Sequence, residues 1–327
     1  MIAVGVGLVG SAGASGQQGG ASALMVGFDD EFTKLYAHVV AGDLPAHNKI
    51  TDKVIALGLS DESVVLSLGD GTGEPGVRIA KALPSVKVLS TDASESMTAQ
   101  AAEYGAGCPN LTTVTVSCDD SDLGAKCQLG AASVDVVVMA FSLMFVPGKE
   151  KCLASIQALL KPGGRVIIVV LSKFGLLPCI GAGMAAVEPQ PAEEPAKEPK
   201  RVETQTVAQL GTGPLSLANP EDLDKLVAGA GLATVSDEGM QYPFPLGPNR
   251  EVARRIGMII MKDPLTAIKE GGKEDAFDVF GDAFIGHAEA KGWVKAGQVI
   301  IPEDECCPRL LVAVRPGAMR SCGCGWF

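Results

Sequence analysis

The stretch Val64-Val65-Leu66-Ser67-Leu68-Gly69-Asp70-Gly71-Thr72-Gly73-Glu74-Pro75-Gly76 decides the fold class of this chain. Its first five residues are mostly apolar and begin with β-branched side chains, which is typical of a buried parallel strand. The glycines let the backbone turn sharply and approach a ligand closely. A helix that begins near Glu74 and Pro75 points its free N–H groups at that ligand. The stretch therefore predicts a strand, a ligand-binding turn and a helix, with a purely structural turn as the alternative.

An acidic residue follows the next predicted strand at an informative distance along the chain. Residues 86–90 are predicted to form this strand, and Asp92 lies just past its end. An acid about 20 residues beyond the turn glycines meets a ribose from the neighbouring strand. Its carboxylate can accept hydrogen bonds from two sugar hydroxyls. The glycine turn and Asp92 together favour a nucleoside-containing cofactor.

With three further motifs, these features resemble the class I S-adenosylmethionine (SAM)-dependent methyltransferases, near the ubiquinone/menaquinone-biosynthesis type. The resemblance extends over residues 28–316 and includes a strand at residues 134–139. The motifs that carry it are the glycine loop, Thr91-Asp92-Ala93-Ser94, Ser117-Cys118-Asp119-Asp120 and Leu159-Leu160-Lys161-Pro162-Gly163-Gly164-Arg165. The last motif, an apolar helix end followed by Lys-Pro-Gly-Gly and a strand, is the most specific to the family.

The resemblance implies SAM as the cofactor and a set of residues that bind it. The implied residues are Gly69, Asp70, Gly71, Gly73, Asp92, Ala93, Asp119, Asp120 and Phe141. Either Asp119 or Asp120 accepts a hydrogen bond from the adenine amino group in this assignment, with a solvated turn as the alternative. The family usually has an acidic residue where this chain has Ser67. Either Asp70 compensates for that difference or the cofactor binds more weakly.

The core of the chain alternates predicted strands with predicted helices. The strands are expected at residues 64–68, 86–90, 113–117, 134–139 and 165–170. This alternation predicts an α/β fold with a Rossmann-like, doubly wound and mostly parallel sheet. Residues 298–301 and 310–314 are predicted to form an antiparallel C-terminal edge of that sheet. Ligands of such sheets bind at the carboxyl ends of the strands, and the later helices are expected to cap the site.

The composition of the chain changes along its length and predicts five segments. They are a flexible leader or targeting segment (1–26), a SAM-binding core (27–175), a Pro/Glu/Ala-rich insertion (176–214), a C-terminal part with substrate-cap helices (215–316) and a Cys-containing tail (317–327). Nine scattered cysteines, an odd number, predict reduced thiols in an intracellular protein. A cytoplasmic location is expected, with organelle targeting by the leader as an alternative.

Charge and composition restrict the partners of the chain. The formal net charge of −11 and the pI of about 4.8 disfavour nucleic acid, because phosphate contacts need clustered Lys and Arg. No apolar run reaches the length of a membrane span. The cysteines at 306, 307, 322 and 324 do not have the spacing of paired zinc knuckles, so no metal site is predicted. The expected partner is a small-molecule methyl acceptor, and the sequence leaves the oligomeric state open.

Methyl transfer from SAM needs a general base only when the nucleophile carries a proton at neutral pH. The candidate catalytic residues are His287 and Tyr36, each with ordinary packing as its alternative. The candidate substrate-binding residues are Arg250, Arg254, Arg255 and Phe145. The scarcity of bases favours a soft or ionised nucleophile, such as a thioether or thiol sulfur, or a quinone-type carbon or oxygen.

Two other functions remain open at the level of sequence. A non-catalytic scaffold with the same fold is one, because Ser67 replaces the usual acid. An NAD(P)-dependent oxidoreductase is the other, because Gly71-x-Gly73-x-x-Gly76 matches the dinucleotide-binding fingerprint. The Lys161-Pro162-Gly163-Gly164 motif before the fifth strand counts against the oxidoreductase.

Overall fold

The structure is a computed structural model, and it describes residues 33–34, 44–188 and 213–317. The α-helices are α2 (Pro45–Ile55), α3 (Gly76–Ala82), α4 (Glu95–Tyr104), α5 (Leu123–Lys126), α6 (Lys149–Leu159), α7 (Leu176–Val187), α8 (Pro220–Gly229), α9 (Arg250–Ile260), α10 (Lys262–Glu270) and α11 (Ala276–Ala290). The strands are β1 (Val64–Leu68), β2 (Lys87–Asp92), β3 (Leu111–Thr115), β4 (Val134–Ala140), β5 (Leu160–Phe174), β6 (Ala233–Gly239), β7 (Phe244–Gly247), β8 (Val294–Lys295), β9 (Gln298–Ile301) and β10 (Cys306–Val314). Two short 3₁₀ helices are η1 (Leu143–Phe145) and η3 (Glu303–Glu305).

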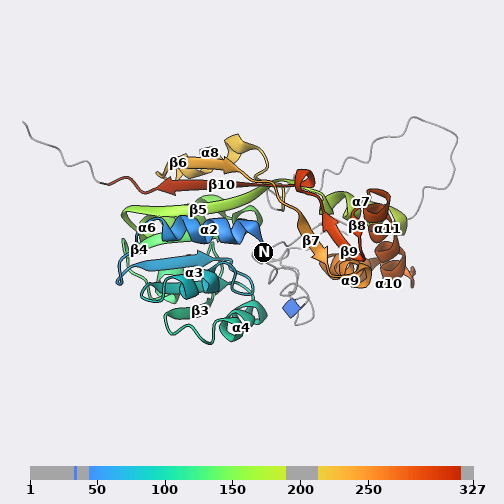
Figure 1. Cartoon of the computed structure of the whole chain (residues 1–327), viewed down its shortest axis with the longest axis horizontal. Coiled ribbons are helices and arrows are strands. Elements are labelled where there is room, and N and C mark those ends of the chain that lie inside the picture. Colours follow the sequence, from blue (N-terminus) through green and yellow to red (C-terminus); the bar gives the residue numbers. More distant parts are fainter. Residues whose placement is uncertain (1–32, 35–43, 189–212, 318–327) are drawn as a thin grey trace, which may run out of the picture.

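A seven-stranded sheet forms the larger part of the molecule (Figure 1). Its strand order is β3-β2-β1-β4-β5-β10-β6. Strands β1 to β5 pair in parallel, whereas β10 runs antiparallel to both β5 and β6. The prediction of a doubly wound, mostly parallel sheet with an antiparallel C-terminal strand is therefore confirmed. The strand order reverses between β1 and β4, and ligands of such sheets bind at this point.

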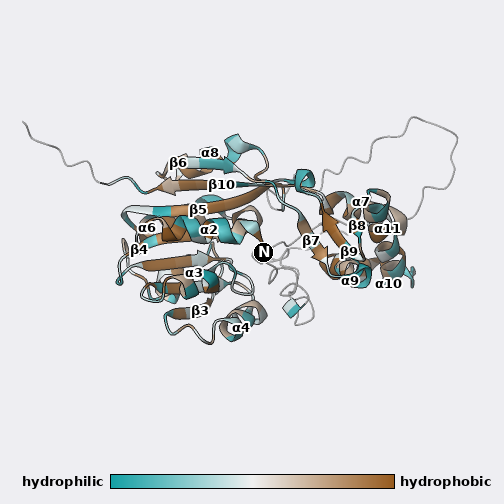
Figure 2. Cartoon of the chain, viewed as in Figure 1, coloured by the Kyte–Doolittle hydropathy of each residue, from teal (hydrophilic) through white to brown (hydrophobic). Residues whose placement is uncertain are grey.

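The central strands are buried on both faces, and their sequences reflect this. Every residue of β4 except Asp135 is buried, and Figure 2 shows hydrophobic colour along most of β5. The one acidic side chain of β4 lies near the start of β1, where it accepts hydrogen bonds from the Val64 N–H and from Lys161. Continuous apolar runs of this kind are typical of parallel strands covered by helices on both faces.

Arg309 fixes the antiparallel strand β10 to its outer neighbours. The residue is only 5% exposed. It donates hydrogen bonds to Asp237 on β6, and to Asp224 and the Pro220 carbonyl on α8. Two carboxylates and a carbonyl thus satisfy a buried guanidinium, as burial of a charge requires.

A smaller unit, which we call the cap, consists of α7, α9, α10, α11 and a three-stranded sheet of order β7-β9-β8. It lies beyond the carboxyl ends of the core strands, and β5 and β10 run from the core toward it (Figure 1). Residues 298–301 were predicted as part of the main sheet, and that prediction is wrong. A two-residue turn at Ala296 and Gly297, both at positive φ, pairs β9 with β8 instead. The place beside β10 is taken by β6.

The first part of the predicted insertion at residues 176–214 is an ordered helix of the cap. Within α7, Leu176, Ile180 and Met184 recur at intervals of four and are buried. Helix α7 packs along α11, where the ring of Phe280 lies against Gly183. A Cβ at position 183 would lie 2.6 Å from that ring, so a glycine is needed for this close packing. Residues 189–212 lie outside the described part.

Candidate functional site

The glycine loop between β1 and α3 packs directly on the segment that follows β4. Gly69 has φ +66°, and a Cβ there would lie 2.5 Å from the Cβ of Ser142. The Ser142 hydroxyl donates a hydrogen bond to the Leu68 carbonyl at 2.7 Å. Only glycine accommodates both the left-handed backbone and this close approach. The loop therefore lies against the β4 end, on the two strands between which the sheet order reverses.

Asp92 connects the carboxyl end of β2 to the glycine loop. The residue is fully buried, and one of its carboxylate oxygens accepts the Gly71 N–H at 3.0 Å. The other oxygen accepts the Ser94 N–H, also at 3.0 Å. Burial raises the pKa of Asp92, and these backbone donors oppose that rise. A carboxylate has about four acceptor positions, so these backbone donors do not exhaust it.

Asp70 was predicted to contact the cofactor, but its carboxylate is bonded within the protein core. Ser67 and Ser90 each donate a hydroxyl hydrogen bond to it at 2.5 Å, and the Gly76 N–H donates at 3.1 Å. The residue is 3% exposed. Ser67 at the end of β1 is thus paired with Asp70 in the loop. Asp70 therefore stabilises the glycine loop through hydrogen bonds on its buried side.

The stability of the protein should fall as pH rises through the titration of Asp70. Burial raises the pKa of this carboxyl from 3.8 to about 6, despite its three hydrogen bonds. Because the folded state binds the proton more tightly than the unfolded chain, the stabilisation is complete below pH 4 and is lost by pH 6. The difference is about 3 kcal/mol from a shift of roughly two pKa units. Urea denaturation of wild type and Asp70→Asn between pH 4 and 7 measures it. Parallel stability curves for the two proteins would contradict this assignment.

The two acids that follow β3 have different surroundings. Asp119 accepts the Ser117 hydroxyl at 2.6 Å and lies near the Gly148 N–H, at 3.4 Å. Asp120 forms an ion pair with Lys126 at 2.5 Å and accepts the Asp122 N–H. The hydrogen bond from Lys126 lowers the pKa of Asp120. Asp119 thus faces the segment after β4, whereas Asp120 is engaged with α5.

Phe141 lies at the carboxyl end of β4, in a left-handed backbone conformation with φ +56°. Its N–H donates to the Val169 carbonyl, which holds it beside β5. Its ring meets the imidazole of His47 edge-on, at 6.3 Å between centroids. Phe145 follows in η1, half-buried, and Ala93 is half-buried beside Asp92. The predicted residues Phe141, Ala93 and Phe145 thus lie at the same edge of the sheet.

The predicted arginine cluster lies on α9, within the cap. Arg250 pairs with Glu289 at 3.1 Å. Arg254 pairs with Asp278 at 2.8 Å and with Asp282 at 3.0 Å. Arg255 lines a shallow groove with Lys262 and Phe277, away from the glycine loop. The structure therefore joins Arg250 and Arg254 to acids of α11 and does not bring the three arginines to the carboxyl edge of the sheet.

The two histidines of the described residues lie in different parts of the fold. His287 lies on α11, where its ring contacts Trp293 edge-on at 6.4 Å. Tyr36 and His38 lie outside the described residues. His47, which sequence reasoning did not select, is 3% exposed and lies beside Phe141. Its position on the apolar face of α2, in line with Ile50 and Val54, was the one signal of its burial.

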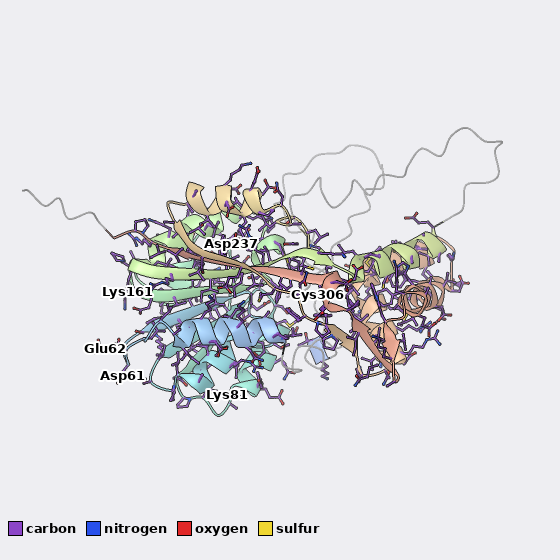
Figure 3. All side chains as sticks on the ribbon, turned by 45° about the horizontal axis from the view of Figure 1, so that its top comes forward. Asp61, Glu62, Lys81, Lys161, Asp237 and Cys306 are labelled. Atoms are coloured by element: carbon purple, nitrogen blue, oxygen red, sulfur yellow. The ribbon has the colours of Figure 1, made fainter. Side chains whose placement is uncertain are left out.

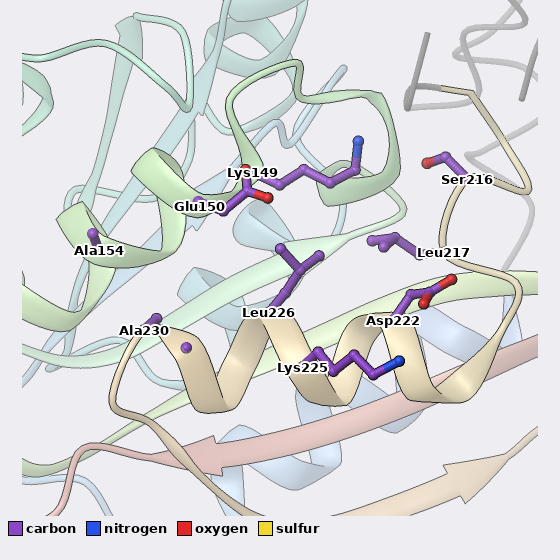
Figure 4. Close-up of a pocket in the computed structure, with 10 residues that line it drawn as sticks. Lys149, Glu150, Ala154, Ser216, Leu217, Asp222, Lys225, Leu226 and Ala230 are labelled. Carbon is purple, nitrogen blue, oxygen red and sulfur yellow. The ribbon is translucent and has the colours of Figure 1, made fainter. Parts of the chain in front are cut away.

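The chain also has a wide groove between α6 and α8, of about 520 Å³ (Figure 4). Lys149 and Glu150 line it from α6, and Asp222, Lys225 and Leu226 line it from α8. Lys149 is largely buried, which lowers its pKa, and its ammonium donates to the Val146 carbonyl. None of the predicted cofactor-binding residues lines this groove, so it is separate from the glycine loop.

Residues 33–34, 44–188 and 213–317 contain neither a metal-binding cluster nor a membrane-spanning helix. No group of three or more His, Cys, Asp or Glu side chains is placed to hold a metal ion there. None of the helices in this part of the chain is long and apolar enough to cross a membrane. Cys322 and Cys324 lie outside the described residues.

Comparison with solved structures identifies proteins of the same fold. Phosphoethanolamine N-methyltransferase 2 of Haemonchus contortus, in complex with phosphomonomethylethanolamine and S-adenosylhomocysteine, superposes with a TM-score of 0.50 at 14% identity. The match covers 88% of this chain and 58% of that protein. The [4+2]-cyclase SpnF superposes with a TM-score of 0.51 at 16% identity, over 88% of this chain and 93% of the cyclase. These similarities show the Rossmann-like fold, which serves more than one activity.

Comparison of sequences points to a narrower group of proteins than comparison of structures does. The chain is 31% identical over 117 residues to the ubiquinone/menaquinone biosynthesis C-methyltransferase of Geobacter sulfurreducens, covering 35% of this chain and 43% of the relative. It is 31% identical over 137 residues to the same enzyme of Ralstonia pickettii, covering 37% and 54%. The chain thus spans about half the length of the curated relatives it matches. A methyltransferase domain family matches residues 66–166, from β1 to β5. The comparisons therefore support a class I SAM-dependent methyltransferase domain over residues 66–166.

Proposed function

We propose that this protein transfers the methyl group of SAM to a small-molecule acceptor. One observation carries the proposal: the glycine loop, Asp92 and Asp119 follow three neighbouring strands at one edge of the sheet. These three features lie within the matched methyltransferase domain. The edge is also where the strand order reverses, which is the usual ligand position in open α/β sheets.

The residues at this edge have the chemistry that SAM requires. Gly69, Gly71 and Gly73 present backbone without side chains, at φ values of +66°, +59° and +102°. Asp92 would accept the ribose hydroxyls through its remaining lone pairs. Asp119 fits the adenine amino group better than Asp120, because Lys126 neutralises Asp120. Ala93 and Phe141 would form walls, whereas Asp70 supports the loop and is not part of the proposed contact surface.

The protein's contribution to the reaction is to position the acceptor and exclude water. SAM, when bound, supplies a methyl group on a sulfonium that is already a good leaving group. Burial lowers the pKa of His47 to about 3, so this imidazole is too weak a base to hold a proton at neutral pH. A soft or ionised nucleophile fits such a site, because orientation supplies most of the rate enhancement. Quinone-type carbon or oxygen acceptors are one such class, and the similarity to quinone C-methyltransferases favours them.

Two titrations and one assay test the proposal. Calorimetry should show SAM binding to the purified full chain, and incubation with quinols, thiols, thioethers and small amines should release S-adenosylhomocysteine with one of them. Binding of NAD(P)H in place of SAM would favour an oxidoreductase. SAM binding without transfer to any acceptor would favour a scaffold or another reaction on this fold, as the cyclase SpnF illustrates.

A further inference from the structure

The seven-stranded sheet ends in two edge strands, β3 and β6, on opposite sides of the core (Figure 1). An edge strand presents backbone N–H and C=O groups that can pair with a strand of another chain. Proteins usually protect such an edge with charged side chains, a β-bulge or a covering element. The two edges of this sheet differ in that protection.

Strand β6 carries both charges and a bulge. Asp237, labelled in Figure 3, and Glu238 place two acids on the strand. Glu238 also forms an ion pair with Lys49 of α2 at 2.7 Å. The register with β10 shifts at Val235, which has no partner on β10, as in a β-bulge. These features hinder the addition of a further strand beside β6.

Strand β3 has none of these protections in the described part of the chain. From Leu111 to Ser117 the sequence reads Leu-Thr-Thr-Val-Thr-Val-Ser, without a charge, a proline or a glycine. Five of these seven residues are β-branched, which favours an extended strand. The pairing of β3 with β2 is regular, without a bulge. An uncharged, strand-forming stretch at the edge of a sheet is a template for pairing with another chain.

The hydrogen bonds to β2 show which backbone groups of β3 are left for a partner. The Val116 N–H donates to the Asp92 carbonyl at 2.8 Å. Because the bonding side alternates along a strand, the N–H and C=O groups of Thr113 and Thr115 point away from β2. The Leu111 N–H also points away, but it donates to a carbonyl of the preceding turn. Two N–H and two C=O groups of β3 are therefore without a partner in the part of the chain that the structure describes.

We propose that β3 pairs with β3 of a second copy of this chain, antiparallel and with the two Val114 residues opposite each other on a twofold axis. In this register Thr113 of each chain lies opposite Thr115 of the other, so the outward groups of the two strands satisfy one another. A register centred on Thr113 would need the Leu111 N–H, which already has a partner. A second copy is a suitable partner because an uncharged strand meets no like charge when it pairs with itself.

The side chains around this edge suit a close approach of two chains. The Thr98 hydroxyl of α4 hydrogen-bonds that of Thr115 at 2.7 Å, so α4 lies over one face of β3. Ala102, one turn after Thr98, is exposed and small. Val114 points to the other face and is half-buried, and α5, the helix that follows β3, has only four residues. Pairing would bring the two Val114 side chains together and bury them further.

The proposed pairing leaves both cofactor sites accessible. A twofold axis between antiparallel strands turns the carboxyl ends of the two sheets in opposite directions. The two glycine loops then lie at opposite edges of one continuous sheet. Self-association through β3 therefore does not depend on the proposed methyl transfer, and each proposal can fail without the other.

Analytical ultracentrifugation of the full chain over a range of concentrations tests the inference. Wild type should sediment as a dimer, with twice the 33.6 kDa mass of one chain. Thr113→Pro removes an N–H that β2 does not use, and proline is tolerated at such edge positions. It should raise the dimer dissociation constant about 10- to 100-fold, because each copy loses one donor to the other. Val114→Lys, which places two like charges opposite each other, should have the same effect even if Thr113→Pro does not fold.

Val235→Lys is the matched control, because it places the same charge on the other edge strand, at a residue that is 56% exposed. This variant should remain a dimer. Hydrogen exchange of the Thr113 and Thr115 amides should slow as the concentration of wild type rises. SAM affinity should be the same in all these proteins, and its loss in wild type would refute the proposed function alone.

Four results would overturn the inference. They are a monomeric wild type, a dimer that survives both substitutions in β3, dissociation caused by Val235→Lys, and slow exchange of the two amides that does not depend on concentration. The last result would mean that the chain covers its own edge.

Discussion

Replacing Asp92 with alanine should weaken SAM binding by about 10²- to 10⁴-fold. The carboxylate is fully buried and faces the glycine loop from the end of β2. In the proposed complex it accepts two charge-assisted hydrogen bonds from the ribose, each worth roughly 1.5–3 kcal/mol. Their combined loss, converted at about 1.4 kcal/mol per tenfold change, gives the stated range. Calorimetric titration of wild type and Asp92→Ala with SAM measures it.

Two further variants make this prediction specific. Asp92→Asn keeps one carbonyl oxygen for the Gly71 N–H but loses the acceptor of the Ser94 N–H, so it should be less destabilised than Asp92→Ala and still lose much of the SAM affinity. Asp120→Ala removes an acid that pairs with Lys126 and should change SAM affinity by less than threefold. Because Asp92 also holds the Ser94 N–H, the thermal midpoint of each variant must be compared first. Equal SAM affinity in wild type and Asp92→Ala would show that Asp92 does not bind the cofactor.

The core of the fold could be predicted because its signals are local in the sequence. Strand β1 has the same bounds in the sequence prediction and in the structure, Val64–Leu68. It is a short apolar run that ends at a glycine, and burial on both faces requires such a run. Helix α4, Glu95–Tyr104, begins at a local signal as well, because the Ser94 side chain caps it by accepting the Met97 N–H. Parallel pairing then follows from the alternation of strands and helices.

Residue roles at the site could not be predicted, because they depend on partners from other elements. Asp70 lies in the glycine loop, and only the structure shows Ser90 of β2 donating to its carboxylate. Arg254 is one of three arginines close together in sequence, yet Asp278 and Asp282 of α11 neutralise it. His47 has no motif around it. Its burial arises because residues from other elements, Phe141 and Phe244 among them, close around it.

The cap was the least predictable part of the chain. Strand β7 has the sequence Phe-Pro-Leu-Gly, and an isolated segment of four residues with a proline gives no periodic signal. Its partner β9 is about fifty residues away in sequence, across α9, α10 and α11. Helix α7 stands between a predicted core and a proline-rich segment, and its many small residues obscure the apolar spacing. Each of these elements depends on contacts with segments that are distant in the sequence.

Replacing Phe280 with alanine should separate the role of the cap from that of the core. Phe280 is fully buried, stacks on Phe284 at 5.9 Å and lies against Gly183 of α7. Loss of a buried phenylalanine costs about 3–5 kcal/mol of folding stability, through lost burial and the cavity left behind. Because α7 and α11 meet at this ring, the cap should lose its packing before the core does.

The functional result of this substitution follows from where each ligand is proposed to bind. SAM affinity should stay within about twofold of wild type, since the glycine loop, Asp92 and Asp119 belong to the core. Methyl transfer should fall at least tenfold, because the cap lies beyond the carboxyl ends of the core strands and a loosened cap would no longer exclude water there. Calorimetry measures the SAM affinity, and product formation measures methyl transfer, both below the melting temperature of the variant.

Asp282→Ala on the same helix is the control, because its exposed ion pair with Arg254 contributes at most about 1 kcal/mol. Parallel loss of SAM affinity and transfer in Phe280→Ala would show that the cap supports the cofactor site as well, and unchanged transfer would exclude the cap from the acceptor site.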